Sequence, residues 1–433
     1  MATTTLTPTT TVERAGFKFT RMLLFSLFFI AIGVWMLFGA QNVAPDVTTR
    51  LTFGFNLPDG SPAQWIIPTQ AYMLVVAVLY VLGGAAALLP MLPKRVKSIW
   101  LLVNGVLLIP TVLIVAAAGN STNITVMLQV SVRLATPVVL GAIAGIWCER
   151  SGVVNIAIEG MMLAGACFGF VAMTLFAAGG MDGYLAQALG VLVAVIAGGA
   201  MSALHAWLSI TFKTDQVVSG TVINILAIGL TSFVRREVLL SSEAGRETLQ
   251  PINIPFLSDI PVLGDVLFKG RPIFYGMFIL LFVTHIVLFH TRWGLRTRAV
   301  GENPRAADSL GINVIRNRWT NVIIGGLIAG LAGAWFSLET NGSFDDNMTS
   351  GRGFIALAAM IFGKYTPFGA FGGGLLFGFS DALGQRFQFL GVPVPNQFLQ
   401  MVPYIITIVV LAGLVGRAVA PKADGVPYEK EGK

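Results

Sequence analysis

Long apolar runs separated by short polar stretches set the pattern of this chain. A helix that spans a bilayer needs about 20 mainly apolar residues, and such runs occur at 22–40, 68–90, 98–118, 125–147, 153–177, 185–211, 216–236, 272–290, 319–338 and 398–416. A further apolar stretch, 353–385, is interrupted at 363–367 and predicts two short helical arms. The pattern therefore predicts an all-α, polytopic transmembrane helical bundle of about 10–12 spans, with broken or re-entrant helices.

Composition agrees with a membrane bundle and excludes other classes of protein. Of the 433 residues, 55% are hydrophobic and only 11% are charged, whereas a soluble domain carries about 25% charged residues. This composition excludes a soluble enzyme, a disordered protein and a coiled coil. The first run follows Arg14, Lys18 and Arg21 and is too long for a typical signal-peptide core, so we expect it to be a retained helix.

The basic residues predict the orientation in the membrane. With the N-terminus in the cytoplasm, about 19 of the 28 Lys and Arg residues fall on the inside and about 8 on the outside, as the positive-inside rule requires. Both termini are then cytoplasmic. The net charge of +7 lies in short loops between apolar runs. It therefore reflects the orientation of a chain surrounded by membrane lipid and argues against a nucleic-acid partner.

The first three apolar runs contain almost no polar residues, whereas from about residue 125 onward polar residues and glycines enter the membrane segments. This change predicts an N-terminal transmembrane extension of about three helices (1–124), a core (125–416) and a cytoplasmic tail (417–433). The loops 41–65 and 237–271 are rich in Pro, Gly and polar residues and long enough to have structure of their own. Glycines four residues apart, such as Gly326 and Gly330, indicate closely packed helices.

The sequence contains no phosphate-binding loop, nucleophile elbow, zinc-protease helix or dinucleotide-binding fingerprint. A phosphate-binding loop ends in Gly-Lys-Ser/Thr, but the single Gly-Lys pair, Gly363-Lys364, precedes Tyr365 within apolar sequence. The three histidines and two cysteines have no metal-ligand or disulfide spacing. We therefore expect no catalytic residue, no metal and no cofactor on this chain, which is not predicted to be an enzyme.

Polar side chains within the core runs are candidates for a substrate pathway, because such groups in a bilayer tend to face a cavity or a partner. Asn155 and Glu159 are four residues apart and are predicted to lie on one face of one helix. They could line a pathway. Alternatively Glu159 pairs with Arg133 or Arg150, or caps broken backbone.

A second polar stretch precedes and enters the run 216–236. Asp215 is predicted to cap the helix, because its carboxylate can accept from the first N–H groups. Ser219 and Asn224 lie farther along. An amide at the depth of Asn224 needs a partner, so it serves either as a contact between helices or as a lining of the pathway.

The segment 291–318 is the only sizeable internal loop, and its sequence predicts a short helix. Asn303 is a typical N-cap and Pro304 suits the first helical position, while Gly311 ends the helix. Ala306, Ala307 and Leu310 would share one apolar face. This helix could rest on lipid headgroups or dock a soluble partner.

Four motifs of this chain resemble those of permeases of ABC importers of the ribose and branched-chain amino-acid type. They are the internal loop with Gly301, Ala306, Ala307 and Gly311-Ile312, and three stretches in matching order: Glu149 to Met162, Asp215 to Asn224, and Gly363 to Gly378. The Glu-Arg-Ser-Gly-Val-Val-Asn stretch from Glu149, with Glu159-Gly-Met-Met, is similar to the nucleoside and simple-sugar branch. The resemblance covers about 125–416, and the first 120 residues depart from the shorter family pattern.

The resemblance implies a permease in a prokaryotic plasma (inner) membrane that moves nucleosides inward by alternating access. Its partners would be an ABC ATPase subunit that binds ATP, a second homologous permease, and a periplasmic or lipid-anchored substrate-binding protein. The expected pathway residues are Asn155, Glu159, Ser219 and Asn224. Coupling to the ATPase is expected at Gly301, Glu302, Asn303, Pro304, Ala306, Ala307, Leu310 and Gly311.

Two other functions stay open from the sequence. A simple sugar is the nearest alternative substrate. A self-sufficient secondary transporter could also contain a discontinuous helix like that at 363–367, although no convincing internal repeat accompanies it. A purely structural membrane scaffold is disfavoured by the loop that resembles a coupling segment.

Overall fold

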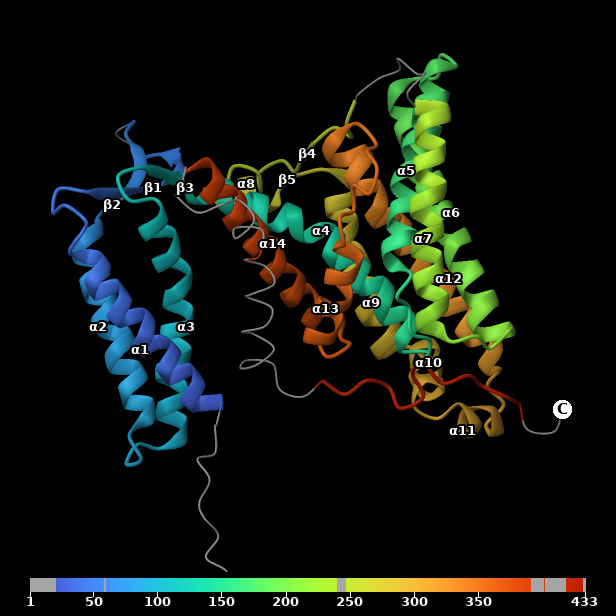
Figure 1. Ribbon diagram of the computed structural model, residues 1–433. Helices are drawn as coiled ribbons and strands as arrows, with labels where there is room; N and C mark the ends of the chain where they lie inside the picture. Colours follow the sequence, from blue (N-terminus) through green and yellow to red (C-terminus); the bar gives the residue numbers. More distant parts are fainter. Residues whose placement is uncertain (1–20, 58–59, 240–246, 391–400, 402–417, 431–433) are drawn as a thin grey trace, which may run out of the picture. The chain divides into compact units, whose positions relative to one another are not determined.

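The structure is a computed structural model that describes residues 21–57, 60–239, 247–390, 401 and 418–430 (Figure 1). Most of the described residues lie in helices. The predicted span at 398–416 lies outside the described residues, except for Met401, and stays a prediction.

The described residues contain nine helices that are long and apolar enough to cross a membrane. They are α1 (Arg21–Ala40), α2 (Thr69–Leu88), α3 (Lys94–Ala116), α4 (Ile124–Glu149), α5 (Ile158–Ala178), α6 (Gly183–Ala206), α7 (Gln216–Val234), α9 (Pro272–His290) and α12 (Val314–Ala334). Short π-helical turns extend three of them: η1 (Trp207–Thr211), η2 (Arg235–Leu239) and η3 (Trp335–Asn341). The predicted all-α membrane bundle is thereby confirmed.

The predicted interruption at 363–367 is confirmed as well. α13 (Arg352–Phe362) ends before it and α14 (Pro367–Phe389) begins within it, at the proline. Lys364 and Tyr365 between them have positive φ values, 52° and 56°, which no α-helix contains. At 23 residues α14 is longer than the predicted short arm. The remaining helices are α8 (Leu263–Leu267), α10 (Arg292–Glu302) and α11 (Pro304–Ser309).

Both long polar loops contain strands, so the prediction that they have structure of their own is confirmed. β1 (Thr48–Asn56), β2 (Pro62–Pro68) and β3 (Ser121–Asn123) form a sheet in the order β2-β1-β3. In the second loop, β4 (Ile252–Asn253) pairs antiparallel with β5 (Lys269–Gly270).

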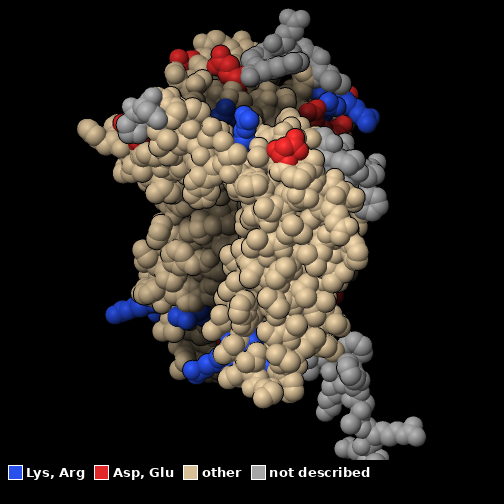
Figure 2. Space-filling model, turned by 90° about the vertical axis from the view of Figure 1, so that its left-hand side faces the viewer, with Lys and Arg blue, Asp and Glu red and all other residues tan. Residues whose placement is uncertain are grey.

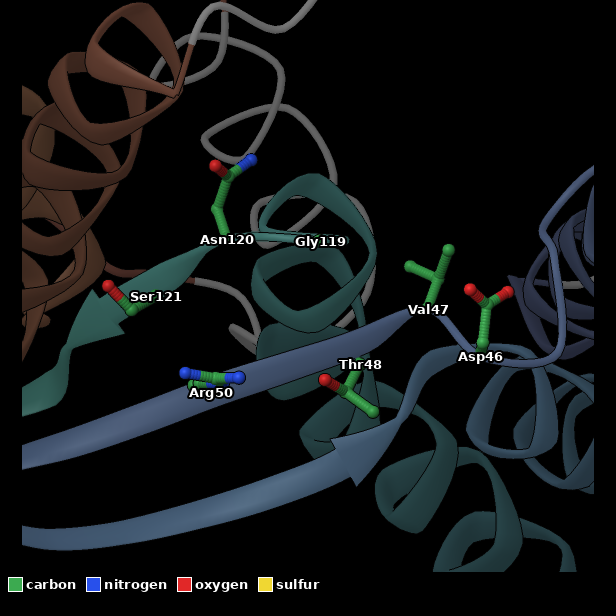
Figure 3. Close-up of a pocket in the computed structure, with 7 residues that line it drawn as sticks. All are labelled: Asp46, Val47, Thr48, Arg50, Gly119, Asn120 and Ser121. Atoms are coloured by element: carbon green, nitrogen blue, oxygen red, sulfur yellow. The ribbon is translucent and has the colours of Figure 1, made fainter.

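The chain divides into two compact units. The first comprises the residues up to Arg50 together with 66–121 and contains α1, α2 and α3. Tyr80 is fully buried there and donates its hydroxyl to Thr111 at 3.0 Å. An open pocket of about 450 Å³ in this unit is lined by Asp46, Val47, Thr48, Arg50, Gly119, Asn120 and Ser121 (Figure 3).

The second unit comprises 51–65 and 122–433, and α12 lies at its centre against α4, α5 and α6. Glycines permit this packing: a Cβ atom at Gly165 of α5 would lie 2.5 Å from the carbonyl oxygen of Gly330 in α12. α14 packs along α4, and α13 contacts both (Figure 1). The glycine spacing thus brings helices into contact, as predicted.

The surface agrees with a protein that crosses a membrane. On the face drawn in Figure 2, charged side chains gather near the two ends and leave a wide uncharged belt between them. Many large apolar side chains are exposed, including Val218, Ile225 and Phe233 along α7. An apolar solvent such as lipid accommodates such a surface, whereas water does not.

Candidate functional site

The loop between α4 and α5, residues 150–157, is the meeting point of the predicted pathway residues. Near the start of the loop, Gly152 has a φ of +84°, which favours glycine. Farther on, the Asn155 side-chain oxygen accepts from the N–H of Ala157 at 3.1 Å. Such a local bond competes with helix formation, and α5 begins only at Ile158. The prediction that Asn155 and Glu159 share one helix face is therefore wrong, because Asn155 precedes the helix.

Asn224 of α7 holds the end of this loop. Its amide nitrogen donates to the carbonyl oxygen of Ile156 at 3.0 Å, and its side-chain oxygen accepts from the N–H of Gly160 at 2.8 Å. Both backbone groups lie where the loop becomes α5 and lack partners within a helix. Asn224 thus fixes the start of α5 against α7.

His205 and Gln216 hold the middle of the loop, and sequence reasoning missed both. The Gln216 side-chain oxygen accepts from the N–H of Val154 at 2.7 Å, and His205 Nε2 lies 3.0 Å from the Val154 carbonyl oxygen. Because a carbonyl only accepts, Nε2 carries the hydrogen. His205 Nδ1 lies 3.1 Å from the hydroxyl of Ser219. A lone histidine in an apolar run offers no sequence signal for this role.

Glu159 is the second residue of α5 and is 5% exposed, and its carboxylate caps the start of α13. Its carboxylate accepts from the hydroxyl of Thr349 at 2.6 Å and from the N–H groups of Gly351 and Gly353 at 2.8 and 2.5 Å. The arginines considered as its partners donate elsewhere: Arg133 to the carbonyl oxygen of Lys269, and Arg150 to that of Tyr365. The carboxylate therefore caps backbone N–H groups at the start of α13, which is one of the roles predicted for it.

The four predicted pathway residues are therefore close to one another in the fold but closed to solvent. Asn155, Glu159, Ser219 and Asn224 are all buried, and the polar side chain of each is bonded within the chain. In this conformation they hold the 150–157 loop and the start of α13. Within the described residues, no group of three His, Cys, Asp or Glu side chains could hold a metal ion.

The short helix predicted in the internal loop is confirmed as α11, but it is shorter than expected. The Asn303 side chain accepts from the N–H of Ala306 at 3.1 Å, and Pro304 is the first helical residue. Gly311 has a φ of +80° and ends the turn. Glu302 is the last residue of α10, so the segment consists of two helices with a cap between them.

The apolar face of α11 is divided between the protein interior and the surface. Ala307 is buried and packs with Val300 and Val314. In contrast, Leu310 is 82% exposed. The buried side fixes α11 to α10 and α12, and the exposed leucine is open to another surface.

Gly301 joins α10 to the 150–157 loop. A Cβ atom there would lie 2.3 Å from the carbonyl oxygen of Arg150, so only glycine allows this approach. Arg150 in turn donates to the Tyr365 carbonyl oxygen at 3.0 Å in the break between α13 and α14. The guanidinium groups of Arg150 and Arg298 both lie over the ring of Phe289. The loop therefore contacts α6, α7, α10 and the broken helix pair.

Comparison with known proteins identifies the family of this chain. A family model described as the permease component of branched-chain amino acid transport systems matches residues 126–411. The guanosine ABC transporter permease protein NupQ of Bacillus subtilis is 42% identical over 314 residues, which are 71% of this chain and 97% of that protein.

Two further relatives match over a similar length. The nucleoside ABC transporter permease protein NupC of Lactococcus lactis is 42% identical over 68% of this chain and 94% of its own. The putative glucose ABC transporter permease protein TsgC13 of Haloferax volcanii is 34% identical over 67% and 92%. No solved structure matches the chain. Because the family model matches most of the chain and relatives are 42% identical to it, the chain belongs to the branched-chain amino acid transport system permease family.

Proposed function

We propose that this chain is the permease subunit of an ATP-driven ABC importer for nucleosides. The carrying observation is its 42% identity to two permeases named for guanosine and nucleoside transport, across nearly their whole length. A simple-sugar importer is the second candidate, supported by the relative named for glucose at 34% identity. Membership of an ABC permease family argues against a self-sufficient secondary transporter.

The proposed complex contains other chains that supply what this one lacks. An ABC ATPase subunit binds ATP, a second homologous permease completes the pathway, and a periplasmic or lipid-anchored binding protein delivers the nucleoside. The excess of Lys and Arg in the inner loops supports a cytoplasmic position for both termini and for α11 in a prokaryotic plasma membrane.

α11 is the proposed docking point for the ATPase. The exposed Leu310, which directly follows α11, is available to a groove on that subunit, and the buried Ala307 of α11 transmits displacement to α10. Gly301 then carries the movement to the 150–157 loop through its contact with Arg150. ATP can drive the transition only if the ATPase binds one conformation of this unit more tightly than the other.

The pathway role proposed for Asn155, Glu159, Ser219 and Asn224 depends on that movement. Their polar groups now bond within the chain. Displacement of the 150–157 loop would release the amide of Asn224 from Ile156 and Gly160 and leave it free to bond to substrate. These polar groups would then exchange hydrogen bonds within the chain for hydrogen bonds to the substrate. Such a route is weakly polar and binds its substrate weakly.

The test is uptake by the complex reconstituted in vesicles with ATPase, second permease and binding protein. We expect ATP-dependent uptake of labelled guanosine and little uptake of glucose. Glucose uptake without guanosine uptake would support the second candidate, and ATP-independent uptake by this chain alone would refute the importer.

A pair of matched variants tests the docking point. Leu310→Glu should abolish co-purification of the ATPase, because it places a charge on the proposed contact without disturbing the interior. Leu263→Glu changes another exposed leucine, 53% exposed, in α8 and should retain the ATPase. Equal ATPase retention in both variants would refute docking at α11.

A further inference from the structure

The C-terminal segment, residues 418–430, lies against the end of α10 and the 150–157 loop. The N–H of Ala423 donates to the carbonyl oxygen of Gly301 at 2.9 Å, and that of Lys422 lies 3.4 Å from the Glu302 carboxylate. Figure 1 shows this segment, in red, running past α10. It therefore bonds directly to the end of α10, which immediately precedes α11.

Arg318 of α12 ties this segment to the 150–157 loop. The side chain is 2% exposed. Its Nε donates to the carbonyl oxygen of Ser151 at 3.2 Å, while its Nη1 and Nη2 donate to those of Val426 at 2.9 Å and Ala423 at 3.5 Å. A buried cation that is not well bonded is strongly destabilising, so these acceptors are needed where they lie.

The backbone of the loop is shaped to admit this arginine. At Gly152, a Cβ atom would lie 2.8 Å from Arg318 Nη2 and 3.0 Å from the carbonyl oxygen of Ala423. The residue also has a φ of +84°. Loop, guanidinium and C-terminal segment therefore meet at one point with no room for a side chain.

Two further contacts extend the segment over neighbouring elements. Tyr428 packs against the cluster of Val300, Ala307 and Val314 that holds α11. Lys213, in the turn before α7, forms an ion pair of 2.6 Å with Glu429. Both charged groups are exposed, so this pair guides the segment and stabilises it little.

Apart from the packing of Tyr428 and the buried Ala423, the segment adds little apolar burial of its own, since Val419 is 72% and Val426 is 52% exposed. Its attachment consists mainly of backbone hydrogen bonds to elements that must move together. Without it, the end of α10 meets the loop through the packing of Gly301 on Arg150. For the loop to follow α10 in both directions of movement, hydrogen bonds must join the two. The segment supplies the bond to Gly301 of α10, and Arg318 supplies the bond to Ser151 of the loop.

We propose that the C-terminal segment is a coupling strap, with Arg318 as its positioning residue, that makes the 150–157 loop follow displacement of α11 in both directions. The inference rests on the proposed function, because it concerns how ATPase movement reaches the pathway. Arg318 touches no substrate and acts through the loop.

The test measures ATP hydrolysed per nucleoside imported by the reconstituted complex. A chain ending at Arg417 and the variant Arg318→Met should each raise this ratio at least fivefold while the ATPase still co-purifies. Arg318→Lys should restore part of the coupling, because an ammonium group reaches fewer of the three carbonyls. Lys213→Met removes only the exposed ion pair and should stay within twofold of the wild type. Wild-type ratios in both the truncated chain and Arg318→Met would overturn the strap.

Hydrogen exchange in the purified full-length chain separates this proposal from the importer. Truncation at Arg417 should accelerate exchange of the amides in 150–157 and 299–311 at least tenfold, and leave those of α5 unchanged. Unchanged exchange in the loop refutes the strap even if transport proceeds. Absence of uptake by the wild-type complex refutes the proposed function, and accelerated exchange would still establish the strap as a mechanical connection.

Discussion

Replacement of Glu159 by alanine separates a structural role from a pathway role. In the wild type, its carboxylate accepts from Thr349, Gly351 and Gly353 at 2.5–2.8 Å. The two glycine N–H groups lie at the start of α13, where no helical partner exists. A Cβ atom at Gly353 would lie 2.6 Å from the Cα atom of Glu159. This close packing leaves little room for a water molecule to replace the carboxylate.

The magnitude follows from the donors left without a partner. An unsatisfied buried donor costs about 1–3 kcal/mol, so the three donors left without a partner in Glu159→Ala should destabilise the fold by roughly 3–9 kcal/mol. Asp182 provides a matched control, because it caps α6 by accepting from Tyr184 and Leu185 at an exposed site. There water replaces the carboxylate, and alanine should cost only about 1 kcal/mol.

Thermal unfolding of the detergent-purified chain gives the measurement. Glu159→Ala should lower the midpoint by at least about 6 °C and Asp182→Ala by no more than about 3 °C. Glu159→Gln keeps one acceptor oxygen and should fall between wild type and alanine. A Glu159→Ala protein with an unchanged midpoint and lost uptake would refute the capping argument and support a pathway role.

Two further predictions concern the coupling segment and the strap. Gly301→Ala should lower the unfolding midpoint and abolish uptake, because its Cβ meets the Arg150 carbonyl oxygen at 2.3 Å, whereas Gly229→Ala in open space on α7 should be neutral or stabilise by up to about 1 kcal/mol; equal midpoints would contradict the close approach. Burial raises the pKa of the Asp424 carboxyl above its usual value, so attachment of the segment is strongest at acidic pH, where the carboxyl is protonated, and weakens as the pH rises through this raised pKa. Protease cleavage of the segment should therefore increase with pH in the wild type and less steeply in Asp424→Asn, which leaves the hydrogen-bonded Glu149 carboxyl in place; a flat wild-type profile would contradict the shift.

Local sequence signals predicted some parts of the candidate site well. Asn303, Pro304 and Gly311 act on neighbouring backbone only, so the cap and end of α11 could be read from the chain. The break at 363–367 followed equally from Pro367 and the interruption of apolar sequence. Asn155 was assigned to the wrong element because four-residue spacing cannot reveal that its side chain bonds the N–H of Ala157 and delays the helix.

Other parts depended on contacts between residues far apart in the chain. Nothing near His205 marks it as a partner of Val154, 51 residues earlier. Arg318 was counted among the basic residues of an internal loop, yet it is buried and binds carbonyl groups at Ser151, 167 residues before it, and Val426, 108 residues after it. The C-terminal segment had no apolar pattern to predict its attachment, because backbone groups make its bonds.

The sequence by itself determined that this protein is a helical membrane bundle, where most of its spans run, and which segment forms the short capped helix. Those properties depend on hydrophobicity and on hydrogen bonds between neighbouring residues, which the order of amino acids specifies directly. Only the tertiary structure decided that the 150–157 loop joins α6, α7, α10 and the broken helix pair, and that Glu159 caps α13. Buried polar groups must find partners wherever the fold brings them, and that choice is made by the packing of distant helices.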